Sequence, residues 1–352
     1  MSGVRSWVPS MAIAPLPRDV PRCDVTVLVC TFNRSADLAA TLDSLKHLQV
    51  DAPLTWEVIV VDNNSTDDTR EVVARRAREF PTALHYLFEA TQGKSNALNT
   101  GLRAARGRLI AFTDDDVRVP TQWLMKSIAP LLEDPTLAYT GGPVRPLWGG
   151  RKPSWLNERG RMGGTIAVMD HGTEPFIFEE HGTIPLGVNM TIRRELVEEI
   201  GGFHPDLGRT GRSLLGQEQA DFFYGSRHAD ARGLYVPGAV LDHVVPVSRL
   251  SRKYFRRWWY WKGLSHARLH ALHGATELGL DLRHVSRLAG VPRYMLRSFA
   301  QHFAGWVAAT LLLRRRQRAE HFCMMAYVIG YARESRRRGA VPAAARFTIA
   351  AH

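Results

Sequence analysis

The chain has 352 residues, of which 45% are hydrophobic and 23% are charged, so it is long enough for one large domain or two modest ones. Its 46 lysines and arginines outnumber its 34 acids and give a formal net charge of +12, which indicates an anionic partner such as a phosphate-bearing substrate, nucleic acid or an anionic membrane. The three cysteines form no CxxC pair, which argues against a zinc knuckle or a disulfide framework and favours a reducing environment.

No segment of the sequence has the character of a leader or a membrane span. The first 22 residues contain one short apolar stretch that prolines interrupt, unlike the core of a signal peptide. The apolar runs near residues 303–313 and 322–331 fall short of the roughly 20 residues that a spanning helix needs. We therefore expect a cytoplasmic protein.

The first half of the chain alternates between strand-like and helix-like segments. Short apolar runs bounded by polar turns are typical of buried parallel strands. Strands are predicted over residues 25–30, 57–61, 84–88 and 109–112, and helices over residues 35–46, 67–79 and 95–105. This βαβαβ order predicts a doubly wound α/β sheet, in which ligands bind beyond the carboxyl ends of the strands.

The second half of the chain is less regular. Residues 141–185 are rich in glycine, proline and tryptophan and look loop-like, and strands are expected near residues 184–190 and 233–240. From residue 251 onward the sequence is helical and basic. The predicted domains are an N-terminal extension over residues 1–23, an α/β domain over residues 24–250 and a basic helical region over residues 251–352.

Polar side chains follow three of the predicted strands. They are Thr31 and Arg34 after the first strand, Asp62 at the end of the second, and the adjacent carboxylates Asp114, Asp115 and Asp116 after the fourth. Parallel strands place these ends at one edge of the sheet. Mg²⁺ or Mn²⁺, which prefer oxygen ligands, would cancel the repulsion among the three carboxylates and bind substrate phosphates with them. A solvated acidic turn, and an Asx-turn at Asp62, are the structural alternatives.

Lys94 lies in the stretch Gly93-Lys94-Ser95, which imitates the end of a P-loop. That motif needs a glycine where the chain has Phe88, so the P-loop interpretation fails. A glycine–lysine pair that opens a helix can still bind phosphate through the helix N-terminus and the cation, and a solvated turn is the alternative. No GxGxxG follows the first strand, which disfavours a nicotinamide-dependent dehydrogenase.

Three later residues have side chains suited to chemistry at such a site. Glu218 and Asp221 are three positions apart and would share a helix face, where one carboxylate could act as a general base. Acids in the first turn of an ordinary helix are the alternative. His243 follows a predicted strand, where a neutral imidazole could be a metal ligand or a structural histidine.

The set of segments resembles the family 2 glycosyltransferases, which have the GT-A nucleotide-diphospho-sugar transferase fold. The resemblance covers roughly residues 24–260 and depends on seven pieces that occur in the family's order, because any one of them alone is weak. The pieces are VLVCTFNR, VIVVDNNSTDDT, QGKSNALNTGLRAARG, IAFTDDDVRVP, LGVNMTIRRELVEEIGGF, LGQEQADFF and the segment around His243.

The resemblance implies an inverting transfer of a sugar from a nucleotide-sugar donor to a hydroxyl acceptor, with Mg²⁺ or Mn²⁺ as cofactor. UDP is the favoured nucleotide, and GDP and dTDP are alternatives. The implied donor-binding residues are Thr31, Arg34, Asp62, Lys94, Asp114 and Asp115, and the implied metal ligands are Asp116 and His243. Glu218 takes the place of the family's catalytic acidic residue, with Asp221 in reserve because Gln219 stands where the family often has aspartate.

Residues 251–263 (SRKYFRRWWYWKG) combine cations with aromatic rings. This composition suits an interfacial helix on an anionic membrane, an RNA-binding surface, or a helix packed on the α/β domain. Arg257-Trp258 match the end of the QxxRW motif of processive polysaccharide synthases, but Tyr254 replaces its glutamine, which favours the transfer of one sugar per encounter. We expect the C-terminal region to hold the protein at the inner face of the cell membrane, near a lipid-linked or saccharide acceptor.

The leading prediction is a metal-dependent glycosyltransferase of cell-surface polysaccharide or glycolipid synthesis with no nucleic-acid partner. A basic nucleic-acid-binding protein is one alternative, but it leaves the carboxylates at the strand ends unexplained because they repel phosphate in the absence of a metal. A catalytically inactive relative that only binds a partner is another, because Glu218-Gln219 departs from the family pattern.

Overall fold

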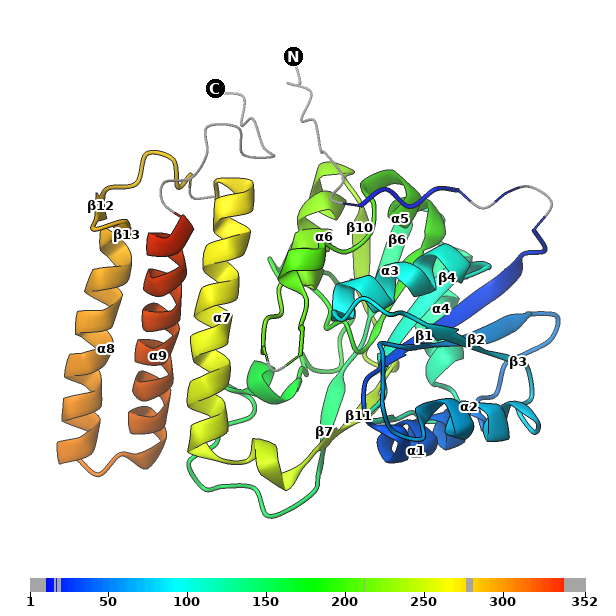
Figure 1. The fold of residues 1–352 in the computed structure, drawn as a ribbon, viewed down its shortest axis with the longest axis horizontal. Coiled ribbons are helices and arrows are strands. Elements are labelled where there is room, and N and C mark those ends of the chain that lie inside the picture. Colours follow the sequence, from blue (N-terminus) through cyan, green and yellow to red (C-terminus); the bar gives the residue numbers. More distant parts are fainter. Residues whose placement is uncertain (1–10, 16, 18–19, 212, 277–280, 339–352) are drawn as a thin grey trace.

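The structure is a computed structural model that describes residues 11–15, 17, 20–211, 213–276 and 281–338 (Figure 1). Most of the expected N-terminal extension and the end of the C-terminal region lie outside the described residues. Figure 1 shows an α/β domain on one side and a layer of long helices on the other. Ile13, from the expected extension, is buried in the core of the α/β domain.

The α/β domain is built on a mixed sheet. Its strands are β1 (Cys23–Thr31), β2 (Trp56–Asp62), β3 (Ala83–Phe88), β4 (Gly107–Asp114), β6 (Leu137–Gly141), β8 (Phe176–Ile177), β9 (Met190–Arg193) and β10 (Arg232–Tyr235). In the part of the chain that the structure describes, these eight strands lie in the order β3-β2-β1-β4-β9-β6-β10-β8. The first four pair in parallel, whereas β9 runs antiparallel to both of its neighbours. The predicted α/β class is therefore confirmed.

Helices cover both faces of this sheet. They are α1 (Ser35–Leu45), α2 (Thr69–Ala77), α3 (Lys94–Ala104), α4 (Trp123–Glu133), α5 (Arg194–Ile200) and α6 (Glu218–His228). Side chains of β1 alternate between two cores, because Leu28 packs into one and Val27 and Val29 pack into the other. This burial on both faces explains why β1, β2 and β4 read as continuous apolar runs, whereas β3 lies at the edge of the sheet and is only partly buried. Each of the four predicted strands lies inside the observed one.

The irregular second half departs from prediction at two strands. The strand expected over residues 184–190 is a loop that reaches β9 only at Met190, and Pro185 within it interrupts regular pairing. The strand expected over residues 233–240 ends at Tyr235, before Pro237 and Gly238. A second sheet contains β5 (Val117–Arg118), β11 (Leu241–Val245) and β7 (Val144–Trp148), and short 3-10 helices span Gly163–Ile166, Pro205–Leu207 and Val247–Arg249.

The C-terminal layer consists of α7 (Arg252–His273), α8 (Arg293–Leu311) and α9 (Arg315–Arg338), with α9 between the other two (Figure 1). A short hairpin of β12 (Arg287–Leu288) and β13 (Val291–Pro292) precedes α8. α7 begins where the Ser251 hydroxyl accepts a hydrogen bond from the Tyr254 amide, and it ends at Gly274, whose φ of 71° suits glycine.

The basic aromatic segment of residues 251–263 lies at the start of α7, where Phe255 and Trp259 are buried and the other aromatic rings are half-buried. Phe255 and Trp259 pack in a cluster with Met162 and Ile166 of the α/β domain and with Cys323 of α9, as the packed-helix alternative for this segment expects. Among the described residues, no helix is both long enough and apolar enough to span a bilayer.

Candidate active site

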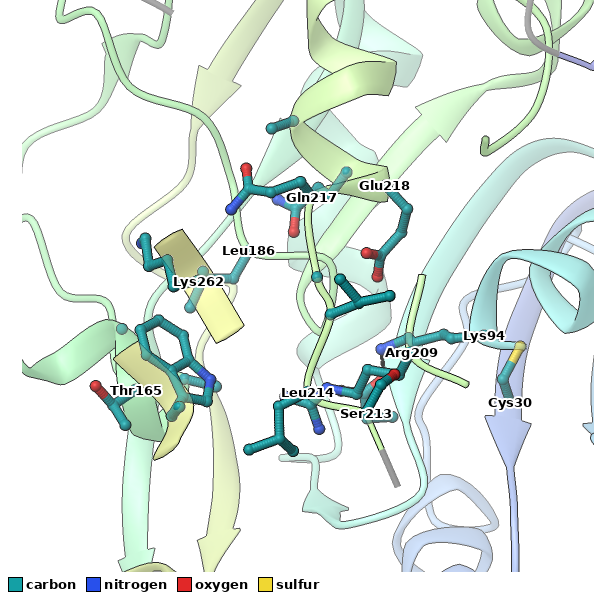
Figure 2. A pocket seen from close by; sticks show the side chains of 18 of the residues that line it. Cys30, Lys94, Thr165, Leu186, Arg209, Ser213, Leu214, Gln217, Glu218 and Lys262 are labelled. Carbon is teal, nitrogen blue, oxygen red and sulfur yellow. Dashed lines mark hydrogen bonds and ion pairs between the residues drawn. The ribbon is translucent and has the colours of Figure 1, made fainter. Parts of the chain in front are cut away.

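A cavity of about 740 Å³ lies at the carboxyl ends of β1 and β4 and extends to α7 (Figure 2). Segments far apart in the sequence line it, including the start of α3, the loop before α6 and one face of α7. Of the predicted site residues, the cavity brings together Thr31, Arg34, Lys94, Asp114, Asp115, Asp116, Glu218 and His243. The strand-end carboxylates and the residue at the start of α6 therefore share one site.

The carboxylates Asp115 and Asp116 share one arginine. Nη1 of Arg34 lies 3.1 Å from Oδ1 of Asp115 and 2.7 Å from Oδ2 of Asp116. Thr31 donates its hydroxyl to Oδ2 of Asp115 over 2.8 Å. Burial raises the pKa of Asp115 to about 6. The charge of Arg34 opposes this rise, and the neighbouring carboxylate of Asp116 adds to it. Cations of the chain itself thus offset part of the repulsion within the acidic trio.

Lys94 has a specific partner in the same trio. Its Nζ lies 2.7 Å from Oδ1 of Asp114. Burial would raise the pKa of Asp114, but the charge and hydrogen bond of Lys94, together with the charge of His243, hold that pKa below its usual value. Gly93, which precedes this lysine at the start of α3, has a φ of 148°, a conformation that glycine adopts readily. Its amide donates to Oδ1 of Asn63 over 2.7 Å, which fixes the turn that aims Lys94 at the carboxylates.

Asp116 and His243 are suited to hold a divalent metal. Nε2 of His243 lies 3.3 Å from Oδ1 of Asp116, and two neighbouring ligands of an octahedral Mg²⁺ are about 3 Å apart. Both side chains line the cavity, and no hydrogen-bond partner is described for the buried Nδ1 of His243. No group of three or more His, Cys, Asp or Glu side chains converges on one point in the described chain, so a metal here would need oxygens from the donor and from water.

Asp116 also contacts a cation that the sequence did not single out. Nη2 of Arg249 lies 3.3 Å from Oδ2 of Asp116. Burial by itself would raise the pKa of Asp116, but His243, Arg249 and Arg34 together hold that pKa well below its ordinary value. Asp116 is therefore a charged carboxylate at neutral pH, which is the form that binds metal.

Two predicted site residues, Asp62 and Asp221, are not among the described residues that line the cavity. Asp62 ends β2, where its carboxylate accepts hydrogen bonds from the Ser65 amide over 2.9 Å and from the Tyr86 hydroxyl over 2.8 Å. The first of these bonds is the Asx-turn alternative. Asp221 is fully buried, and its Oδ1 lies 2.7 Å from Nε2 of His273 in α7. Glu218 and Asp221 are thus close in sequence but face different surroundings.

Glu218 is the first residue of α6, and its carboxylate points toward the region of Lys94 and Arg209 (Figure 2). Its residue is 9% exposed, and no hydrogen-bond partner of Oε2 is found among the described residues. Burial raises the pKa of Glu218 above its ordinary value, while the charges of Lys94 and Arg209 pull it down. A buried carboxylate with an oxygen available for a new hydrogen bond is suited to accept a proton from a ligand.

The cavity also contains residues that the sequence did not identify as a site. Trp258, Lys262 and His266 lie on one face of α7 and line the cavity, and Figure 2 shows Lys262 across the cavity from Lys94. Nζ of Lys262 lies 5.1 Å from the ring centroid of Trp258. Their spacing of four residues is the signal that could have placed them on one helix face, but only the tertiary structure shows that this face meets the cavity.

The chain was compared with known proteins. The sequence model of glycosyl transferase family 2 matches residues 26–201. The succinoglycan biosynthesis protein ExoM of Rhizobium meliloti is 30% identical over 278 residues, which are 75% of this chain and 82% of that protein. Glycosyltransferase AglE of Haloferax volcanii is 31% identical over 186 residues, which are 51% of this chain and 55% of that protein.

A comparison of structures agrees. The mannosyltransferase PcManGT from Pyrobaculum calidifontis, solved in complex with GDP-Man and Mn²⁺, superposes with a TM-score of 0.58 at 21% identity, over 94% of this chain and 90% of that one. This likeness confirms the GT-A fold that the sequence predicted. The match of the family model and the relationship to ExoM establish the activity class, in which a nucleotide-sugar is the donor. The chain belongs to glycosyl transferase family 2.

Proposed function

We propose that the protein is a metal-dependent, inverting glycosyltransferase that moves a sugar from a UDP-sugar to a hydroxyl group of a lipid-linked or saccharide acceptor. One observation carries the proposal: Glu218, whose Oε2 has no partner among the described residues, lines the same cavity as Asp114, Asp115 and Asp116. Residues 24–250 would form the catalytic domain, and residues 251–352 the region that meets the acceptor and the membrane.

In this proposal each cavity residue has a role. Glu218 takes the proton from the acceptor hydroxyl, whose oxygen forms a bond to the anomeric carbon as the bond to the nucleoside diphosphate breaks on the opposite side. Asp114 and Asp115 bind the ribose of the donor near Thr31, and Lys94 and Arg34 lie beside its phosphates. Asp116 and His243 would hold Mg²⁺ or Mn²⁺, which supplies Lewis-acid stabilisation of the leaving diphosphate when bound.

The acceptor would enter from the α7 end of the cavity. Figure 2 shows Lys262 across the cavity from Glu218, and Trp258 lies beside this lysine. An indole ring offers a sugar an apolar surface, and an ammonium attracts a phosphate or a carboxylate. These two side chains favour a saccharide with an attached phosphate, as a lipid-linked acceptor has. The relationship to ExoM, which is named for succinoglycan biosynthesis, favours a growing cell-surface polysaccharide made at the inner face of the membrane.

A thermal-shift panel tests the proposal. UDP-, GDP- and dTDP-sugars are each added to the full chain with and without Mn²⁺. A ligand that binds only the folded state raises its stability by mass action, so a UDP-sugar with Mn²⁺ should give the largest rise in melting temperature. A larger rise with a GDP-sugar or a dTDP-sugar would change the proposed donor, and a rise of equal size without Mn²⁺ would remove the metal from the proposal.

A further inference from the structure

The outward face of α8 is apolar over its second half. Phe303, Val307 and Leu311 are 51%, 37% and 78% exposed, and their spacing of four residues places them in one stripe. Leu312 and Leu313 are 59% and 82% exposed and continue the stripe into the turn before α9. Figure 1 shows α8 as the outermost helix, with α9 between it and α7. An exposed apolar stripe of this kind indicates an interaction surface.

Arginines flank this stripe at both ends. Arg293 and Arg297 are exposed in the first half of α8. Arg297 is four residues after Arg293 and fourteen residues before Leu311, and with 3.6 residues per turn these spacings place all three side chains on the same face of the helix. At the other end, the chain continues from Leu313 directly into three exposed arginines at residues 314–316. The surface thus combines an apolar centre with positive charge on either side.

We propose that this membrane-docking surface, formed by the outward face of α8 and the turn over residues 311–316, binds an anionic lipid bilayer. Residues 303–311 extend about 12 Å along α8, which suits a helix that lies in the interface with its apolar side chains among the acyl chains and the flanking arginines on anionic headgroups. The proposal rests on the proposed function, since a lipid-linked acceptor is presented at a membrane.

The charge distribution decides between a bilayer and a second copy of the chain. A parallel pairing of two α8 helices places the arginines of the turn against their own copies. An antiparallel pairing places that turn against Arg293 and Arg297. Both arrangements bring like charges together, which costs free energy, whereas an anionic bilayer complements all of these arginines.

Vesicle flotation of the full chain tests the surface. Phosphatidylcholine vesicles with about 30% phosphatidylglycerol should carry the protein upward in a density gradient at low salt, and pure phosphatidylcholine vesicles should not. The double variant Leu311→Ser/Leu313→Ser and the double variant Arg314→Glu/Arg315→Glu should each weaken binding by about tenfold or more. The changed side chains are exposed, so circular dichroism should show an unchanged fold.

Matched controls lie in the α/β domain. Leu132 and Leu147 are 47% and 45% exposed, and Leu132→Ser/Leu147→Ser should float like the wild type. Arg75 and Arg78 are exposed near the end of α2, and Arg75→Glu/Arg78→Glu should also float like the wild type. If the control variants lost as much vesicle binding as the α8 variants, the proposed membrane-docking surface would be overturned, because binding would then depend on the overall charge and apolarity of the protein.

The remaining outcomes also decide. Wild-type protein that stays at the bottom of the gradient would overturn the proposal. Sedimentation velocity gives a second test: if the wild type is a dimer that Leu311→Ser/Leu313→Ser converts to a monomer, and flotation does not change, the stripe is a dimer interface and the proposal is overturned. Donor-dependent thermal shifts are measured on the same samples. A chain that floats but shows no thermal shift with any nucleotide-sugar would contradict the proposed function and support the membrane-docking surface. A chain that shows the shift but does not float would support the proposed function and contradict the membrane-docking surface.

Discussion

Oδ1 of Asp221 lies 2.7 Å from Nε2 of His273, and the side chains of both residues are at most 1% exposed. The contact joins α6 to α7 one helical turn after Glu218. It therefore fixes the start of α6, and with it the carboxylate of Glu218, against the C-terminal helices. The two acids that the sequence offered as a base have separate surroundings, because one faces the cavity and the other faces the helix layer.

Glu218→Gln should abolish most transfer while preserving donor binding. The amide keeps the shape of the side chain but cannot accept a proton, so kcat should fall by about 10²- to 10⁴-fold. Sugar transfer measures the loss, and the thermal shift with the donor shows that binding is unchanged. Transfer at the wild-type rate would remove Glu218 from the mechanism.

Asp221→Asn should lower stability rather than the chemical rate. A buried partner left with an imperfect hydrogen bond costs about 1–3 kcal/mol of the free energy of unfolding. Denaturant unfolding measures that loss, and kcat per folded molecule should stay close to the wild-type value. A loss of kcat as large as that of Glu218→Gln, with stability intact, would make Asp221 the base.

The transfer rate should rise with pH through a pKa higher than the ordinary value of about 4.3 for glutamate. Burial raises the pKa of Glu218, and the charge of Asp114 in β4 adds to this rise. The charges of Lys94 in α3 and Arg209 in the loop before α6 oppose it. The proposed base, Glu218, would be active when deprotonated, so activity should be lost as pH falls through this raised pKa. The pH profile of kcat measures it, and the residual activity of Glu218→Gln should lack the same limb.

Asp116→Asn and His243→Gln should each weaken the response to metal. Each change removes one of the two proposed protein ligands, so the rise in melting temperature expected from Mn²⁺ in the presence of UDP should shrink or vanish. Asp51→Asn, at an exposed position, is the matched control and should respond like the wild type. An unchanged response in both site variants would place the metal elsewhere or exclude it.

Gly330→Ala should destabilise the C-terminal helix layer. A Cβ at Gly330 of α9 would collide with the Tyr260 carbonyl oxygen of α7, so the two helices would have to separate. Overpacking of this kind costs about 1–3 kcal/mol, although alanine in an open helix is more stable than glycine. Thermal and denaturant unfolding measure the change. Gly164→Ala is the control because a Cβ there meets nothing within 4 Å.

Much of the α/β core was predictable because its signals are local. Strands β1 and β4 are buried on both faces, so apolar runs identified them without knowledge of their neighbours. The prediction of a strand over residues 184–190 was wrong, because an apolar run beside Pro185 can also be a loop that lines a cavity. Periodicity does not distinguish such a loop from a buried strand. The antiparallel placement of β9 between β4 and β6 follows from pairing between distant segments.

The sequence by itself determined the chemistry at the strand ends: which side chains follow each parallel strand is a matter of order along the chain, and parallel strands place those ends together. The tertiary structure decided how that chemistry is distributed. It separated Glu218 from Asp221, paired Lys94 with Asp114, and brought Trp258 and Lys262 of α7 to the same cavity. Such contacts depend on the packing of helices far apart in the sequence, and side-chain spacing within one helix carries no information about the partner it meets.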